Sequence, residues 1–173
     1  MVLKGSELIT ESELTDQMIV LSGLLRSSGI KFATAESCTG GLIAKVATDL
    51  SGSSEWFDRG LVTYSNEAKQ DLLGVSDVTL DRYGAVSSEV VDEMVKGLLR
   101  FKAVSIGVAV SGIAGPDGGS DNKPVGTVWL AWKNAHHSVI SQCFIFKGNR
   151  DQIRLQSSLE AIKGLIRLLK NDQ

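Results

Sequence analysis

The sequence Thr34-Ala35-Glu36-Ser37-Cys38-Thr39-Gly40-Gly41 lies between a short apolar run, 30–33, and the segment 42–47, for which the sequence predicts a helix. A serine, a cysteine and a threonine therefore lie where a strand is expected to turn into a helix. Two glycines allow the backbone to come close to a bound molecule. The first N–H groups of a helix have no partner within it, and the helix dipole adds positive potential there. The stretch is therefore a candidate site for a nucleophile and an oxyanion or phosphate, with plain helix capping by Ser or Thr as the alternative.

Helices and strands are predicted to alternate on both sides of this stretch. Apolar residues at helical spacing, with capping residues at the ends, predict helices over 11–28, 42–50, 66–73, 80–83, 88–99 and 149–170. Short apolar and β-branched runs predict strands over 31–35, 61–64, 104–110, 125–132 and 139–146. The last two strands are expected to form a hairpin, and a packed turn is expected over 55–60.

This order of elements predicts an α/β fold. Strands separated by helices form a mostly parallel sheet covered on both faces, and the hairpin adds an antiparallel strand. We expect one domain over 11–173, preceded by a loose lead-in over 1–10. Ligands of such sheets bind outside the carboxyl ends of the strands. Three polar turns are expected to meet there, namely 36–41, 64–69 and 111–119.

Composition argues against several classes of protein. The 173 residues are 43% hydrophobic and 22% charged with a net charge of −2, so no excess of positive charge favours nucleic acid. No apolar run reaches the length that spans a membrane. Two cysteines are too few for a disulfide framework, and we therefore expect a protein of the reducing cytoplasm.

The first two polar turns together offer a nucleophile and a base. The hydroxyl of Ser37 is a weak nucleophile until a base removes its proton. Lys69 acts as such a base only if burial or a neighbouring positive charge lowers its pKa. Tyr64 is a candidate to relay a proton or to orient Lys69. The alternative is an exposed lysine in the first turn of a helix, which is the commoner place for lysine.

Other polar residues give weaker indications. Arg150 begins the last predicted helix and is a candidate phosphate ligand, with a solvated arginine as the alternative. His136 and His137, the only histidines, lack accompanying Cys or acidic residues, which argues against a metal site and against a Ser-His-Asp triad. The Gly-rich segment 115–119 lacks the Lys-Ser or Lys-Thr of a Walker A motif, but its amides are candidates for the wall of a pocket.

Five motifs, in this order along the chain, resemble those of the CinA C-terminal family. They are Ala35-Glu-Ser-Cys-Thr-Gly-Gly41, Gly60-Leu-Val-Thr-Tyr-Ser-Asn-Glu-Ala-Lys69, Gly84-Ala-Val-Ser87, Val110-Ser-Gly-Ile-Ala-Gly-Pro-Asp-Gly-Gly119 and Lys123-Pro-Val-Gly-Thr-Val128. The resemblance extends over residues 12–170. Within the family, the chain looks most like the stand-alone nicotinamide-nucleotide amidohydrolases.

The resemblance implies a three-layer α/β/α sandwich with a mixed, mostly parallel sheet. It also implies hydrolysis of nicotinamide mononucleotide to nicotinic acid mononucleotide and ammonia, by a serine amidase that uses no metal or other cofactor. Matching the motifs makes Ser37 the nucleophile, Lys69 the base and Tyr64 an assisting group. The residues implied to bind the substrate, some of them through backbone amides, are Cys38, Thr39, Gly40, Gly41, Ser111, Gly112 and Arg150.

Two other interpretations of the site stay open. In the first, the chain is a non-catalytic nucleotide-binding module in which Ser37 and Thr39 bind phosphate. In the second, Cys38 is the nucleophile, as in many amidases. We also expect a homo-oligomer, most simply a dimer, whose partners include neither nucleic acid nor a membrane.

Overall fold

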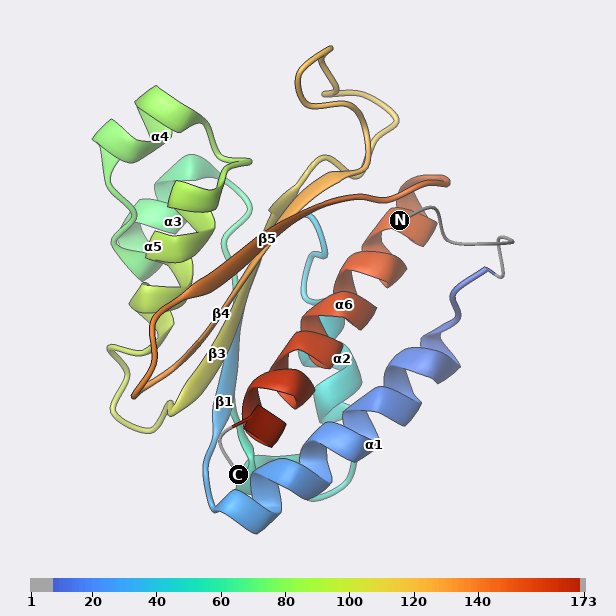
Figure 1. The fold of residues 1–173 in the computed structure, drawn as a ribbon, viewed down its shortest axis with the longest axis vertical. Coiled ribbons are helices and arrows are strands. Elements are labelled where there is room, and N and C mark those ends of the chain that lie inside the picture. Colours follow the sequence, from blue (N-terminus) through green and yellow to red (C-terminus); the bar gives the residue numbers. More distant parts are fainter. Residues whose placement is uncertain (1–7, 172–173) are drawn as a thin grey trace.

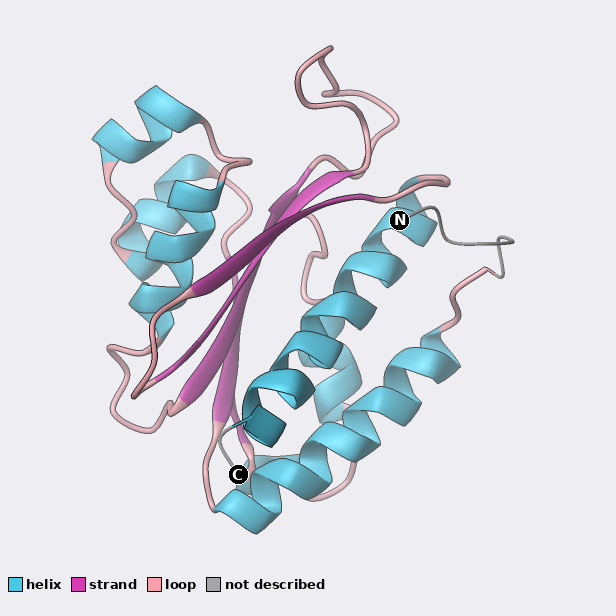
Figure 2. Ribbon diagram, viewed as in Figure 1, coloured by secondary structure: helices cyan, strands magenta, loops and turns pink. Residues whose placement is uncertain are grey.

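A five-stranded sheet lies between two layers of helices (Figure 1; Figure 2). The computed structural model describes residues 8–171. The helices are α1 (Glu11–Ser28), α2 (Leu42–Thr48), α3 (Asn66–Leu73), α4 (Asp77–Tyr83), α5 (Ser88–Leu98) and α6 (Arg150–Asn171), with the short 3-10 helix η1 (Ser53–Glu55). The strands are β1 (Phe32–Glu36), β2 (Phe57–Val62), β3 (Ile106–Gly112), β4 (Thr127–Asn134) and β5 (Ile140–Ile145).

The sheet combines a parallel part with an antiparallel part, and its strands lie in the order β2-β1-β3-β4-β5. Strand β1 pairs in parallel with both β2 and β3, whereas β4 pairs antiparallel with β3, and β5 antiparallel with β4. Every residue of β1 is buried, as is usual for a strand inside a sheet that helices cover on both faces. The predicted α/β/α sandwich with a mixed sheet is confirmed, and parallel pairing accounts for two of its four strand pairs.

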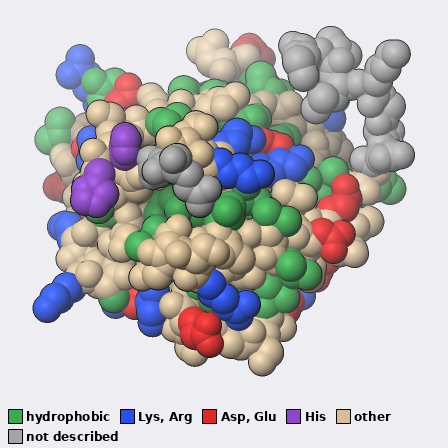
Figure 3. Space-filling view, turned by 60° about the horizontal axis from the view of Figure 1, so that its bottom comes forward, with side chains coloured by type: hydrophobic (Ala, Val, Ile, Leu, Met, Phe, Trp, Pro, Cys, Tyr) green, Lys and Arg blue, Asp and Glu red, His purple; other side chains and the backbone are tan. Residues whose placement is uncertain are grey.

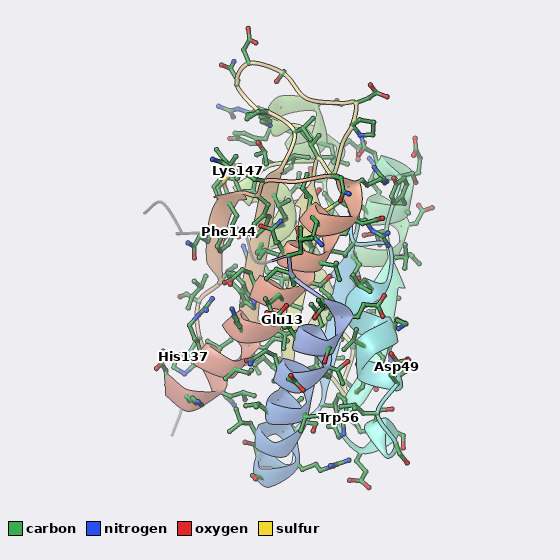
Figure 4. The ribbon with its side chains drawn as sticks, turned by 90° about the vertical axis from the view of Figure 1, so that its right-hand side faces the viewer. Glu13, Asp49, Trp56, His137, Phe144 and Lys147 are labelled. Atoms are coloured by element: carbon green, nitrogen blue, oxygen red, sulfur yellow. The ribbon has the colours of Figure 1, made fainter. Side chains whose placement is uncertain are left out.

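Each face of the sheet has its own layer of helices. Helices α1, α2 and α6 cover one face, and α3, α4 and α5 cover the other (Figure 1). On the first face α6 approaches β4 closely, because Gly164 lies against the indole of Trp132, where any Cβ would overlap the ring. The same indole donates a hydrogen bond of 2.9 Å to the carbonyl of Ala161. Figure 4 looks onto this layer, with Glu13 on α1 in front of the sheet. None of the described helices is both long and apolar enough to span a membrane.

The edge strand β2 begins earlier than predicted. We expected a packed turn over 55–60 and a strand over 61–64, but Phe57, Arg59 and Gly60 already pair with β1, with Asp58 at a shift in register. The charged residues in this segment masked the strand in the sequence, and an edge strand tolerates them. Arg59 finds a partner in the ring of Phe101, whose centroid lies 3.8 Å from the guanidinium carbon.

Hydrogen bonds fix the chain just before α1. The backbone N–H of Thr10 donates to the carboxylate of Glu13 over 2.8 Å, which caps the helix. The backbone of Ile9 exchanges two hydrogen bonds, of 3.1 and 3.0 Å, with the side chain of Gln152 on α6. The loose lead-in predicted for 1–10 lies outside the described residues over 1–7, whereas Ile9 and Thr10 are fastened to the domain.

Candidate active site

The turn after β1 is built around the carboxylate of Glu36, the last residue of that strand. Glu36 is 0% exposed, so its oxygens depend entirely on hydrogen bonds from the protein. The first backbone N–H groups of α2 point at it, where the helix dipole favours a negative charge. The five donors are the hydroxyls of Thr34 (3.0 Å) and Thr39 (2.8 Å) and the N–H groups of Gly41 (3.0 Å), Ile43 (3.1 Å) and Ala44 (2.9 Å).

No role for Glu36 was predicted from the sequence. The signal that could have revealed it is an acidic residue that ends a fully buried strand and directly precedes a helix start. Glutamate is rarely buried without partners, and the nearest donors in such a position are the unpaired amides of the helix.

The amides predicted to hold an oxyanion are only partly available. The N–H of Gly41 donates to Glu36, and that of Gly40 donates to the carbonyl of Ser37 over 3.0 Å. Within residues 8–171, the N–H groups of Cys38 and Thr39 form no hydrogen bond to another residue. Cys38 directly follows Ser37 and lines the cleft, so its amide is the one placed to bind a substrate oxygen, whereas Thr39 is fully buried outside the lining.

Arg154 of α6 fastens the nucleophile turn from the other side. Its guanidinium donates a hydrogen bond of 2.9 Å to the carbonyl of Thr39. Because the hydroxyl of Thr39 is bonded to Glu36, the side chain and the carbonyl of this residue are both engaged within the protein. Three residues predicted to bind substrate, Thr39, Gly40 and Gly41, lie outside the lining of the cleft, and the first contributes at most its backbone N–H.

Lys69 and Ser37 form the polar centre of the site. The amine nitrogen of Lys69 lies 3.2 Å from Ser37 Oγ, and Lys69 is 1% exposed. Its other hydrogen bonds go to the backbone carbonyls of Thr63 (2.8 Å), Tyr64 (3.3 Å) and Ser65 (3.4 Å). Burial lowers the pKa of Lys69 from its ordinary value, because removal from water disfavours the charged amine. The alternative of an exposed lysine is therefore wrong.

The backbone holds this pair together. Ser65 caps α3 by accepting a hydrogen bond of 3.0 Å from the N–H of Ala68, so that the first turn of α3 carries Lys69 back toward β1. Thr63 donates its N–H to the carbonyl of Glu36 over 2.9 Å and accepts from Lys69 through its carbonyl. One peptide segment thus binds both the strand that ends at Glu36, directly before Ser37, and the base.

Tyr64 meets Lys69 through its backbone and Arg150 through its side chain. The ring is 62% exposed, and its hydroxyl lies 3.1 Å from a guanidinium nitrogen of Arg150. Another guanidinium nitrogen of Arg150 donates a hydrogen bond of 2.7 Å to the carbonyl of Gly115. The carbonyl of Tyr64 is a hydrogen-bond partner of Lys69, whereas its hydroxyl contacts Arg150, and the role of Tyr64 in orienting Lys69 stays a prediction.

A cleft of ≈ 290 Å³ brings the three predicted polar turns together at the carboxyl end of β1. Ser37, Cys38, Tyr64 and Lys69 line it from one side. Its other lining residues are Ala85, Val86, Ser111, Gly112, Ile113, Ala114, Gly115, Asp117, Gly118 and Arg150. Figure 1 shows the long loop between β3 and β4 extending beyond this end of the sheet.

Two lining residues have their side chains fixed inside the protein. The hydroxyl of Ser111 is buried and donates a hydrogen bond of 2.7 Å to the carbonyl of Ala85. This bond joins two walls of the cleft. Cys38 is 5% exposed, and burial, with a smaller contribution from the charge of Glu36, raises the pKa of its thiol to about 12. Such a thiol is almost entirely protonated at neutral pH, and the thiolate is the nucleophilic form.

The two histidines lie far from the cleft. They follow Asn134, which pairs with Ile106 at the amino end of β3, whereas the cleft lies at the carboxyl end. Figure 4 places His137 at the end of the sheet away from the long loop, and Figure 3 shows the two purple side chains close together on the surface. Over residues 8–171, no group of three or more His, Cys, Asp or Glu side chains is arranged to hold a metal ion.

Comparison with known proteins agrees with the motifs. The chain matches the family model described as the CinA C-terminal domain over residues 15–169. It is 48% identical over 164 residues to nicotinamide-nucleotide amidohydrolase PncC of Enterobacter agglomerans, which covers 94% of this chain and 100% of that protein. It is 49% identical over 157 residues to PncC of Escherichia coli strain K12, which covers 91% of this chain and 95% of the relative.

Comparison of the fold with solved structures identifies the same family. The crystal structure of competence/damage inducible protein CihA from Agrobacterium tumefaciens superposes with a TM-score of 0.86 at 40% sequence identity. That superposition covers 97% of this chain and 99% of the other. With a family match over nearly the whole chain and close relatives of the same length, the chain belongs to the CinA C-terminal domain family.

Proposed function

We propose that this protein hydrolyses the carboxamide of nicotinamide mononucleotide to nicotinic acid mononucleotide and ammonia, and so recycles pyridine nucleotides. The relatives named nicotinamide-nucleotide amidohydrolase PncC support the reaction. The single observation that carries the mechanism is the buried amine of Lys69, 3.2 Å from Ser37 Oγ, with uncharged oxygens as its hydrogen-bond partners. Such an amine is suited to accept the proton of a serine nucleophile.

The first half of the reaction forms an ester with Ser37. A neutral Lys69 has two N–H groups for the surrounding carbonyls and a lone pair for the hydroxyl hydrogen of Ser37. As Oγ attacks the carboxamide carbon, Lys69 takes the proton, and the carbonyl oxygen becomes an oxyanion. The N–H group of Cys38, which lines the cleft, binds that oxyanion. Collapse of the intermediate breaks the C–N bond, and the Lys69 ammonium gives its proton to the departing ammonia.

The second half of the reaction releases the acid. With ammonia gone, Lys69 is neutral again and removes a proton from a water molecule that attacks the ester carbon. The same amide binds the second oxyanion. Cleavage of the ester bond returns the proton from Lys69 to Ser37 Oγ and frees nicotinic acid mononucleotide. The enzyme ends in its starting protonation state.

Arg150 is the proposed ligand of the phosphate. Its guanidinium lies at the edge of the cleft, held by the carbonyl of Gly115 and the hydroxyl of Tyr64, with further N–H groups available. Replacing Arg150 with alanine should raise KM for the mononucleotide about 10- to 100-fold, the effect of losing hydrogen bonds between charged groups. The turnover number should change little.

Two comparisons test this role of Arg150. Arg167→Ala, on the same helix but outside the cleft, should leave KM unchanged. Nicotinamide riboside, which lacks the phosphate, should be turned over equally by wild type and Arg150→Ala. An equal loss on riboside and mononucleotide would show that Arg150 does not bind the phosphate.

The assay that tests the function measures ammonia release and formation of the acid from nicotinamide mononucleotide by the purified protein. Wild-type turnover that is absent in a Ser37→Ala preparation supports the proposal. Tight nucleotide binding without ammonia release would favour the non-catalytic binding module. The oligomeric state stays a prediction, to be measured by light scattering on the same preparation.

A further inference from the structure

We infer that Glu36 is a positioning residue for the nucleophile, and that it selects which backbone amides face the substrate. The inference rests on the proposed function, since it concerns how Ser37 reaches the carboxamide. Glu36 lies next to Ser37 in the chain but outside the cleft lining, so it acts through the turn that it holds. No step of the proposed reaction transfers a proton to or from it.

The donors around Glu36 show how it holds the turn. One oxygen accepts from Thr34 and Ala44, and the other accepts from Thr39, Gly41 and Ile43. The carboxylate therefore ties the strand before it, the turn after it and the first residues of α2. The turn closes around it through Gly40 and Gly41, whose φ angles of 61° and 93° favour glycine.

This arrangement decides where a negative charge binds in the site. The helix amides that would attract a substrate anion already bind the carboxylate of Glu36. The N–H group of Cys38, on the Ser37 side of the turn and in the cleft lining, is left to bind the oxyanion. The direction of this peptide group depends on the Glu36 hydrogen bonds, and a change at Glu36 should misplace the oxyanion contact more than the phosphate contacts.

Glu36→Gln is the main test, because it keeps the shape but replaces one oxygen with an NH₂ group. The hydroxyls of Thr34 and Thr39 can rotate to accept from that group, but a backbone N–H cannot. The least disruptive placement turns the NH₂ toward Thr34 and Ala44 and loses the bond from Ala44. We expect kcat to fall about 100-fold, as for a small misplacement of reacting groups. KM should stay within about threefold, since Arg150 does not contact the turn.

A matched control separates positioning from general destabilisation. Leu165→Ala removes a fully buried side chain of α6, away from the cleft, and should lower Tm without changing kcat at a temperature well below Tm. If Glu36→Gln is folded, by circular dichroism and cooperative melting, and keeps kcat within threefold of wild type, the inference is wrong. A rise in KM equal to the fall in kcat would also overturn it, since it would indicate collapse of the whole cleft.

A milder variant keeps the test decisive if Glu36→Gln does not fold. Thr39→Val removes one hydroxyl donor to Glu36 and leaves every backbone amide and the charge in place. It should lower kcat about 3- to 10-fold with KM unchanged, in line with the loss of one hydrogen bond to a charged group. Unchanged kcat in a folded Thr39→Val protein, together with unchanged kcat in Glu36→Asp, would overturn the inference.

A second readout distinguishes failure of this inference from failure of the proposed function. A fluorophosphonate reacts with an activated serine and needs the same oxyanion contacts, but it needs no nucleotide. Wild type should be labelled at Ser37, and Glu36→Gln should be labelled about 100-fold more slowly if positioning controls the reaction. If wild type labels rapidly yet releases no ammonia from nicotinamide mononucleotide, the substrate is wrong, and the labelling rates still decide the role of Glu36.

Discussion

Replacing Ser37 with alanine is expected to abolish ammonia release from nicotinamide mononucleotide while leaving nucleotide binding intact. Among residues 8–171, the hydroxyl of Ser37 is the only hydrogen-bond partner of the buried amine within 3.2 Å that belongs to a cleft-lining residue. Its removal eliminates the covalent route, and we expect the rate to fall by about 10⁴-fold or more. Binding should survive because Arg150 and the amide of Cys38 are untouched. Isothermal titration with the product acid measures this directly.

The double variant sharpens the prediction for Ser37. If Ser37 and Lys69 act as one unit, Ser37→Ala combined with Lys69→Ala should be little slower than either single variant. Additive losses would indicate that the two residues contribute to separate steps.

The same experiment decides whether Cys38 is the nucleophile. The thiol is buried and its pKa is raised to about 12, so few molecules carry the reactive thiolate at neutral pH. Cys38→Ala keeps the backbone amide and should retain most of the activity. Cys143→Ala, on the exposed edge strand, controls for effects of thiol reagents at the surface. An inactive Cys38→Ala protein beside an active Ser37→Ala protein would contradict the serine mechanism.

The second large effect concerns the protonation of Lys69. Burial disfavours the charged amine, so the lysine loses its proton at a lower pH than an exposed lysine would. Because the neutral form is the base, kcat/KM should rise with pH through the lowered pKa of Lys69 and level off above it. The midpoint should lie below the ordinary lysine value of 10.5.

Lys69→Arg tests this assignment with the charge kept. Guanidinium stays protonated across the accessible pH range and cannot serve as the base. We expect activity to fall about 10²- to 10⁴-fold, the usual contribution of a general base, and the pH dependence to disappear. Lys45→Arg, an exposed lysine in ion pairs with Glu11 and Asp49, should change neither. An unchanged pH profile in Lys69→Arg would show that another group is titrating.

The sequence was sufficient to predict that Ser37 and Lys69 lie close together. Both follow predicted strands of one sheet, and the carboxyl ends of parallel neighbours meet at one edge. The burial of Lys69 could not be read from the sequence, because it depends on three carbonyls of the loop 63–65 turning inward.

The hydrogen bonds around the turn after β1 could also not be predicted from the sequence. Periodicity and capping rules indicate that helix amides need partners, but they do not say whether a ligand or a neighbouring side chain supplies them. Here Glu36 does so, which removed Gly41 from the set of predicted oxyanion ligands. The early start of β2 was hidden for a related reason, since charged residues on an edge strand look like those of a turn.

The backbone of Thr63 links the two residues proposed to react, whereas the groups proposed to recognise the nucleotide lie in other parts of the fold. Main-chain groups of Thr63 bind both the carbonyl of Glu36 and the amine of Lys69, so the geometry of the reacting pair is carried by peptide groups continuous with the sheet. The groups that would recognise the nucleotide lie instead on loops and at the start of α6. If Ser37 and Lys69 react as proposed, a lineage can exchange loop residues and acquire a different amide substrate while it inherits the reacting pair unchanged with the sheet.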